Sequence, residues 1–295
     1  MAHTVPRYSR ASPRYFARPN WRWSCARTAA SYAYLLAKLN VVGWRTVRRG
    51  RVCDPHSGVA VTTQALPTDG ERRYYLIAAI GIVIVVLAGF SIDVPLLSNP
   101  ARVSVLVRAH GLIMLTWIAL FFTQTLLVAR HRVDLHMRLG LFGAALAGVV
   151  VVADAATLIT ACRLGGKHLP PGLPPSLFLA FGVFNLSTFA VLVGAALILR
   201  LRRSDWHKRF MLLAVILLLD AALSRFIAVY TSWNVDASVV RNLLMLACIL
   251  VDTVRFRRLH PAFVIGGLLV FGNDHVAIWA TGTQVWAHIT RVLLS

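Results

Sequence analysis

Five polar side chains interrupt otherwise apolar stretches of the sequence and are the first candidates for chemistry: His110, Asp154, Asn185, Asp220 and Arg225. At a rise of about 1.5 Å per residue, helices through these stretches bring all five to similar depths in the outer half of a membrane domain. Ionisable groups in hydrocarbon are costly, so they normally face a bundle interior or a cavity. The pattern favours either a substrate cavity or proton path, or a neutral hydrogen-bonded network that fixes helix packing.

Opposite charges at one depth are expected to pair, because pairing offsets part of the lost hydration. We expect Arg225 to meet either Asp154 or Asp220. His110 is then available to bond the remaining carboxylate. The sequence leaves the choice between the two carboxylates open.

A second group of polar side chains is expected at the opposite, inner edge of the membrane. His136, His207 and His260 each open a span, and Gln124 and Asp252 lie just inside the same edge. Three histidines at one depth can bind a metal, and two can hold a haem b iron from both sides. Histidines at helix starts beside arginine also cap helices or meet lipid headgroups, and this alternative stays open.

Short motifs add little to these two groups. Asp134 precedes His136 by two residues and Asp205 precedes His207 by two, so either carboxylate could orient an imidazole. The sequence contains no GxxxxGK[ST], no GxGxxG after a strand and no HExxH. No catalytic residue is therefore assigned, and an enzyme is the less favoured class.

Seven apolar stretches must position these side chains, because about 20 apolar residues cross a bilayer core of roughly 30 Å. The tail Thr281–Ser295 follows them, and Trp279 and Trp286 near the outer surface predict a short interfacial helix there. The expected spans are Tyr74–Val94, Val103–Val128, Leu139–Cys162, Leu177–Leu199, Phe210–Tyr230, Val239–Val254 and Ala262–Ala280.

The basic loops fall on one side of these spans. They are 130–138 after the second span, 200–209 after the fourth and 255–258 after the sixth. The basic segment before the first span lies on the same side. Basic loops face the cytoplasm, so we expect the N-terminus inside and the C-terminus outside.

The composition agrees with a membrane domain. Hydrophobic residues make up 58% of the 295 residues and charged residues 14%, below the roughly 25% usual in soluble domains. The formal net charge of +20 sits in the N-terminal segment and the loops, which argues against a nucleic-acid partner. The four cysteines contain no CxxC pair, so a zinc ribbon or disulfide framework is not expected.

Residues 1–70 differ from the rest and predict a basic, disordered arm ahead of a transmembrane domain over 71–295. Residues 1–60 hold eleven Lys or Arg and one acid, Asp54, without helix or strand periodicity. Three explanations fit: a misplaced start with Val59 or Val61 as the first residue, a genuine cytoplasmic arm, or a transit peptide.

Several segments together resemble a family of uncharacterised bacterial multi-pass membrane proteins. The resemblance covers about residues 71–290, omits the arm and carries no assigned activity. It rests on His110 to Trp117, Gln124 to Val128, Leu135 to Gly140, His207 to Ala214, Arg225 and His260 to Ala262.

The segment from His110 to Arg130 also resembles a helix of the cytochrome b561 superfamily, in which a histidine ligates haem and HG-x-x-M precedes a tryptophan. That superfamily uses paired histidines at two depths of a four-helix core. This chain has three at the inner edge and one in the outer half. The resemblance therefore implies at most a single inner haem b, held by two of His136, His207 and His260.

Taken together, the sequence predicts an all-α polytopic transmembrane bundle of about seven spans in a bacterial cytoplasmic (inner) membrane. Its partner is the lipid bilayer, and its activity is transport or sensing of a small solute through the outer-half polar residues. The alternatives are a membrane redox protein with haem b at the inner histidines, and a structural component without a ligand.

Overall fold

The computed structural model describes residues 51–53, 60–62, 68–91, 104–165, 169, 172–231 and 235–294. The chain divides into two compact units, Met1–Leu66 and Pro67–Ser295. In the first unit, strands β1 (Arg51–Cys53) and β2 (Ala60–Thr62) pair antiparallel, with Arg51 opposite Thr62. The sequence did not predict this pair, and most of the predicted arm over residues 1–70 lies outside the described residues.

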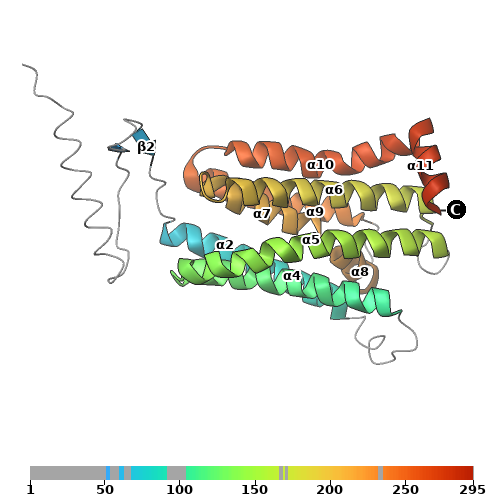
Figure 1. Ribbon diagram of the computed structural model, residues 1–295, viewed down its shortest axis with the longest axis horizontal. Coiled ribbons are helices and arrows are strands. Elements are labelled where there is room, and N and C mark those ends of the chain that lie inside the picture. The colour runs from blue at the N-terminus through green and yellow to red at the C-terminus, as the bar shows by residue number, and fades with distance from the viewer. Residues whose placement is uncertain are drawn as a thin grey trace, which may run out of the picture. The chain divides into compact units, whose positions relative to one another are not determined.

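The second unit is a bundle of helices (Figure 1). Six of its described helices are long and apolar enough to cross a bilayer, and a bent pair, α7 with α8, can form a seventh span. The predicted all-α fold with about seven spans is confirmed. The helices are α2 (Asp69–Phe90), α4 (Val105–Ala129), α5 (Val133–Leu164), α6 (Pro175–Leu199), α7 (Ser204–Leu217), α8 (Asp220–Tyr230), α9 (Ala237–Phe256), α10 (Pro261–Thr281) and α11 (Gln284–Leu294).

Most predicted boundaries are close to the observed ones, and the differences have local causes. Helix α2 begins five residues before the predicted Tyr74, because the Thr68 hydroxyl caps it by accepting from the backbone N–H of Glu71 at 3.3 Å. Its predicted end at Val94 lies outside the described residues. Helix α5 begins six residues before the predicted Leu139, directly after the turn that ends α4.

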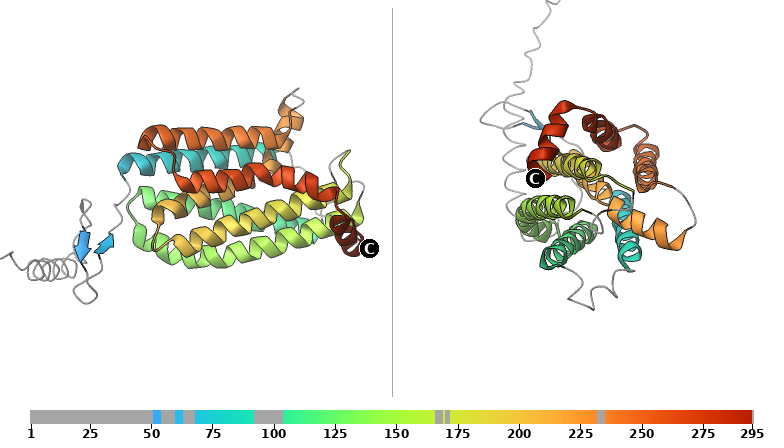
Figure 2. Two further views of the ribbon diagram at one scale, coloured as in Figure 1. Left: turned by 90° about the horizontal axis from the view of Figure 1, so that it is seen from above. Right: turned by 90° about the vertical axis from the view of Figure 1, so that its right-hand side faces the viewer.

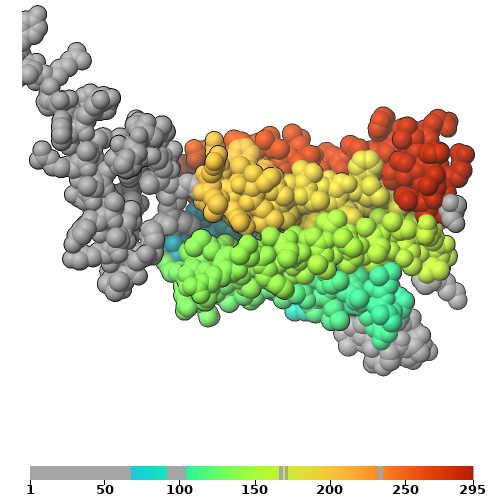
Figure 3. Space-filling model, in the orientation of Figure 1, coloured from blue at the N-terminus to red at the C-terminus, as the bar shows by residue number. Residues whose placement is uncertain are grey.

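Helix α7 forms the centre of the bundle and packs against α6, α9 and α10 (Figure 2). Every side chain from Leu212 to Leu217 is at most 1% exposed. The outer helices instead expose large apolar side chains, such as Leu141 and Val152 on α5. Figure 3 shows the side of the bundle over which α4, α5 and α6 lie next to one another. Exposed apolar surface on every outer helix is what lipid, rather than water, solvates.

The fifth predicted span is not one straight helix. Helices α7 and α8 meet at an angle of 42°. At the break, the N–H groups of Leu218 and Leu219 donate to carbonyls three residues back, Val215 at 3.2 Å and Ile216 at 3.1 Å. This tight turn replaces the normal four-residue spacing and redirects the chain. Residues 204–230 contain neither proline nor glycine, so the break has no sequence signature.

A glycine on the neighbouring helix accommodates α8. A Cβ built at Gly89 of α2 would lie 2.3 Å from the carbonyl oxygen of Ala222. Only a residue without a side chain allows the two backbones to approach this closely. Gly89 therefore fixes where α8 can lie after the break.

Helix α11 confirms that the tail after the last span is helical. Its Trp286 is buried and donates from Nε1 to the carbonyl of Ser176 at 3.1 Å. Arg163 on α5 donates to the carbonyl of Leu293 at 2.7 Å. Helix α11 is therefore docked on the ends of α5 and α6, whereas Trp279 at the end of α10 is exposed.

Candidate functional site

An ion triad of Asp220, Arg241 and Asp274 lies directly after the break in α7–α8. Asp220 is the first residue of α8, Arg241 is in the first turns of α9 and Asp274 is in α10. The side chain of Arg241 is 0% exposed. Its Nη1 donates to Asp220 Oδ2, and its Nη2 donates to Asp274 Oδ2 at 2.5 Å. One wholly buried guanidinium therefore ties three helices together.

An amide network extends the triad to α6. The Asn273 amide donates to Asn185 Oδ1 at 2.7 Å, and the Thr188 hydroxyl donates to Asn273 Oδ1 at 3.0 Å. The same Asn273 amide lies 3.4 Å from Asp274 Oδ1. Asn185, one of the predicted residues, thus contacts the triad through Asn273.

Of the two carboxylates expected for Arg225, Asp220 is not its partner, because this carboxylate bonds Arg241. Arg225 donates to the carbonyl of Ala221 at 2.8 Å, and its guanidinium lies 4.7 Å from the ring centroid of Phe90.

His110 of α4 and Asp154 of α5 approach each other, which is one of the two pairings expected for His110. The distance from His110 Nδ1 to Asp154 Oδ1 is 3.9 Å, which is within ion-pair range but too long for a hydrogen bond. Both side chains are partly exposed. The five predicted residues are thus divided: Asn185 and Asp220 belong with the triad, and His110 and Asp154 face each other on α4 and α5. Arg225 of α8 lies over Phe90 of α2.

Sequence reasoning missed Arg241 and Asp274, although the signal was present. Both are ionisable residues inside the predicted sixth and seventh spans. Ionisable groups at membrane depth are functional candidates by default. The same rule that selected Asp220 would have selected both.

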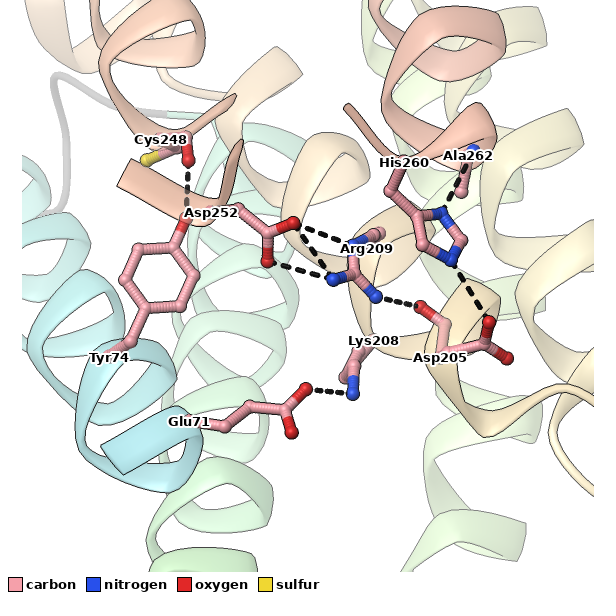
Figure 4. A network of polar contacts seen from close by, with 9 residues as sticks. All are labelled: Glu71, Tyr74, Asp205, Lys208, Arg209, Cys248, Asp252, His260 and Ala262. Carbon is pink, nitrogen blue, oxygen red and sulfur yellow. Dashed lines mark hydrogen bonds and ion pairs between the residues drawn. The ribbon is translucent and has the colours of Figure 1, made fainter. Parts of the chain in front are cut away.

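The opposite end of the bundle carries a second polar network, drawn in Figure 4. Arg209 of α7 binds the Asp252 carboxylate of α9 through two nitrogens, at 2.8 and 2.9 Å from Nη2 and 3.1 Å from Nε. Both side chains are at most 3% exposed. Arg209 Nη1 also donates to the carbonyl of Asp205 at 2.9 Å. Because one arginine meets one carboxylate, this pair is electrically balanced.

The network reaches α2 through two further contacts. The Tyr74 hydroxyl donates to the carbonyl of Cys248 at 2.8 Å, and Lys208 pairs with Glu71 (Figure 4). With Arg209 and Asp252 these residues join α2, α7 and α9 at one end. The network connects helix ends and leaves its charges paired, so packing accounts for it.

His260 is held by this network and caps a helix. Its Nδ1 accepts from the backbone N–H of Ala262 at 3.1 Å, so its proton is on Nε2, which donates to Asp205 Oδ2 at 2.9 Å. Burial lowers the pKa of His260, although its hydrogen bond to Asp205 opposes the shift. Asp205 therefore orients His260, and not His207 as the two-residue spacing suggested.

His136 and His207 lie near each other, with ring centroids 6.4 Å apart. His207 Nδ1 is 2.9 Å from the carbonyl of Ala196 and must donate to it, which leaves Nε2 free. The Gln124 amide is oriented so that its nitrogen donates to His136 Nδ1 at 2.6 Å and its oxygen accepts from the backbone N–H of Gly140 at 3.0 Å. The His136 proton is then on Nε2.

These hydrogen bonds do not fit the predicted two-histidine haem. A ligating nitrogen needs a free lone pair, and only His207 keeps one among the three histidines. Within the described ranges, no three or more His, Cys, Asp or Glu side chains are grouped as a metal site. In this arrangement His260 caps α10, and His136 and His207 bond Gln124 and the carbonyl of Ala196.

No family model, curated protein or solved structure matches this chain. The resemblance to the cytochrome b561 superfamily consequently has no support from a family match. The fold defines the class of protein: it is an integral, multi-pass helical membrane protein, in contact with the lipid bilayer along its apolar spans.

Proposed function

We propose that the protein transports a small solute across a membrane, with the ion triad as the binding site. The observation that carries the proposal is the position of Asp220, Arg241 and Asp274 at a broken span. Transporters bind solutes near interrupted helices, because the break frees backbone groups for the ligand. Non-helical backbone at membrane depth is tolerated only inside protein or beside a cavity.

The charges of the triad cost free energy at membrane depth, which calls for a reason to keep them there. An ionisable side chain inside a span costs roughly 2.5–3.5 kcal/mol on insertion scales. The inner Arg209–Asp252 pair shows that one balanced pair can join helices in this bundle. A second, unbalanced group is not needed for packing alone, which favours a binding role for the triad.

The orientation follows from the basic loops. Arg130 and Arg132 follow α4, Arg200 and Arg202 follow α6, and a further basic loop follows α9. We propose that this end faces the cytoplasm of a bacterial inner membrane, with α11 on the outer side. The triad would then open toward the outside, since Arg241 lies near the start of α9.

Binding can be tested without knowing the solute. Purified protein in detergent is heated in the presence of a panel of amino acids, amines, sugars and carboxylates, and the unfolding midpoint is measured. A solute at about 100 times its Kd stabilises the folded state by about 2.7 kcal/mol. We expect at least one compound to raise the midpoint of the unmodified protein and of Asp134→Asn, an exposed control.

The same compound should not raise the midpoint of Asp274→Asn, and only the unmodified protein and the control should accumulate it in proteoliposomes. If no compound shifts the midpoint, or if Asp274→Asn responds equally, the proposal is wrong.

A further inference from the structure

We propose that the ion triad binds one exchangeable proton and that the transport is therefore coupled to protons. This inference rests on the proposed transport function. The inference begins with the charges. Asp220 and Asp274 contribute −2 and Arg241 contributes +1, so the ionised triad carries −1. Asp236, which also acts on Asp220, is negative as well.

Among the described residues, Arg241 is the one cation that pairs with either carboxylate, and Arg225 donates to the carbonyl of Ala221 instead. The polar side chains next to the triad are the amides of Asn185, Asn242 and Asn273, which are neutral. The Asp220 and Asp274 side chains are 27% and 15% exposed, so water reaches them only in part. An uncompensated charge that water reaches only in part raises the free energy of the folded protein. A carboxyl group in such a place usually takes up a proton and becomes neutral.

One oxygen of the triad is available for the proton. Asp220 Oδ2 is bonded to Arg241, whereas Asp220 Oδ1 is buried without a hydrogen-bond partner among the described residues. Asp274 Oδ1 instead receives the Asn273 amide. Addition of H⁺ converts one carboxylate to a carboxylic acid, and the net charge of the triad becomes zero.

A divalent metal ion fits the triad poorly. Arg241 occupies one oxygen of each carboxylate, and Ca²⁺ needs about 6–8 oxygen ligands. The guanidinium would also repel a dication held between the same carboxylates. A proton needs only one oxygen and one unit of charge.

Protonation also changes the contact that holds the broken span. A neutral Asp220 attracts Arg241 less strongly, and Arg241 then forms an ion pair with Asp274 alone. Asp220 opens α8, so its release frees the start of that helix to move relative to α9 and α10. The coupling step is thus the gain or loss of one proton at the break.

Infrared spectroscopy of the purified full-length protein during a pH titration tests the proposal. We expect a reversible carboxylic-acid C=O band equivalent to one group in the unmodified protein and in Asp134→Asn. The band should be lost in Asp220→Asn and in Asp274→Asn, because either change alone brings the triad to zero charge. A result from either variant suffices if the other does not fold.

Two infrared results overturn the proposal: no reversible band in the unmodified protein, or a band that persists in a folded Asn variant. A thermal-unfolding midpoint that rises with NaCl, but not with choline chloride at equal ionic strength, also overturns it. The last result would assign the charge to Na⁺. The solute panel gives a separate answer: if a compound stabilises the protein while the band criterion fails, the transport function stands and only the proton is rejected.

Discussion

Arg209 and Arg241 are both buried arginines, but their carboxylate environments differ. Arg209 meets the single carboxylate of Asp252, whereas Arg241 lies between Asp220 and Asp274. Removing a carboxylate therefore has opposite electrostatic consequences at the two sites. At the inner pair it leaves a buried positive charge, and at the triad it removes an excess negative one.

The first residue-scale prediction concerns the inner pair. Asp252→Asn should lower the free energy of unfolding by about 3–5 kcal/mol, because it leaves the guanidinium of Arg209 buried without a counter-charge. Chemical denaturation in detergent measures the change. Asp134→Asn, which breaks an exposed contact with Arg132, should cost less than about 1 kcal/mol. Equal stability of Asp252→Asn and the unmodified protein would contradict the assigned role of this pair.

A second prediction concerns the pH dependence of stability. Because burial lowers the pKa of His260 in the folded state, the unfolded chain binds the proton more readily. The contribution of His260 is fully present above its unfolded pKa of about 6.5 and is lost as the pH falls through its lower folded value. Asp205, Arg209 and Asp252 are the charged groups that act on it.

His260→Asn is the matched variant, because asparagine can still cap α10 but does not titrate in this range. Unfolding midpoints measured from pH 8 to pH 5 should fall less steeply for this variant than for the unmodified protein. Parallel curves would show that His260 does not contribute to the pH dependence.

The third residue-scale prediction concerns haem. With these hydrogen bonds, His207 keeps a ring nitrogen whose lone pair is free, whereas His136 and His260 do not. Protein purified from cells supplied with haem precursors should therefore show no Soret absorption band. A Soret band that disappears in His207→Ala and in His136→Ala would restore the two-histidine site.

At the scale of elements, the break between α7 and α8 determines the candidate site. The position of α8 after the break depends on a close approach to α2, since the Cβ of an alanine at position 89 would collide with the Ala222 backbone. The tight turn at Leu218 and Leu219 then directs Asp220 toward α9. Neither condition is visible in the local sequence of the broken span.

Gly89→Ala should therefore destabilise the bundle by about 1–3 kcal/mol, because backbone atoms cannot yield as a flexible side chain does. Thermal unfolding in detergent measures the effect. Gly81→Ala, on the same helix with no atom within 4 Å of its Cβ, should leave stability unchanged or slightly improved. If both variants behave alike, α2 and α8 are not as closely packed as described.

At the scale of the whole molecule, the bent pair decides the number of crossings. Six straight spans plus α7–α8 as a broken span give seven, which places the two ends of the transmembrane unit on opposite sides. If α7–α8 is a re-entrant loop, the count is six and both ends share one side.

Reporter fusions distinguish these two arrangements. With the basic loops in the cytoplasm, alkaline phosphatase fused after Ser295 should be active, and a cytoplasm-dependent fluorescent protein at the same site should be dark. The same reporters fused after Arg202 serve as the control and should give the reverse pattern. An inactive phosphatase after Ser295 would support the re-entrant arrangement and contradict seven spans.

The sequence by itself determined the spans, because crossing a bilayer requires only a long apolar run, which is a local property. Val239–Val254 and Ala262–Ala280 correspond to α9 and α10 within two residues at each end. It also identified Asp220 and Asn185 as residues of the candidate site, since polar groups are rare at that depth.

Only the tertiary structure decided which charges meet. On α2, α4, α5, α6 and α10 the lipid-facing and core-facing sides are both apolar, so the sequence gives little periodic signal for how these helices are rotated. The pairing of Asp220 with Arg241 instead of Arg225 depends on that rotation and on the order of helices around α7. The position of α8 after the break likewise depends on a glycine in another helix, Gly89, which lies more than 130 residues before Ala222 in the chain.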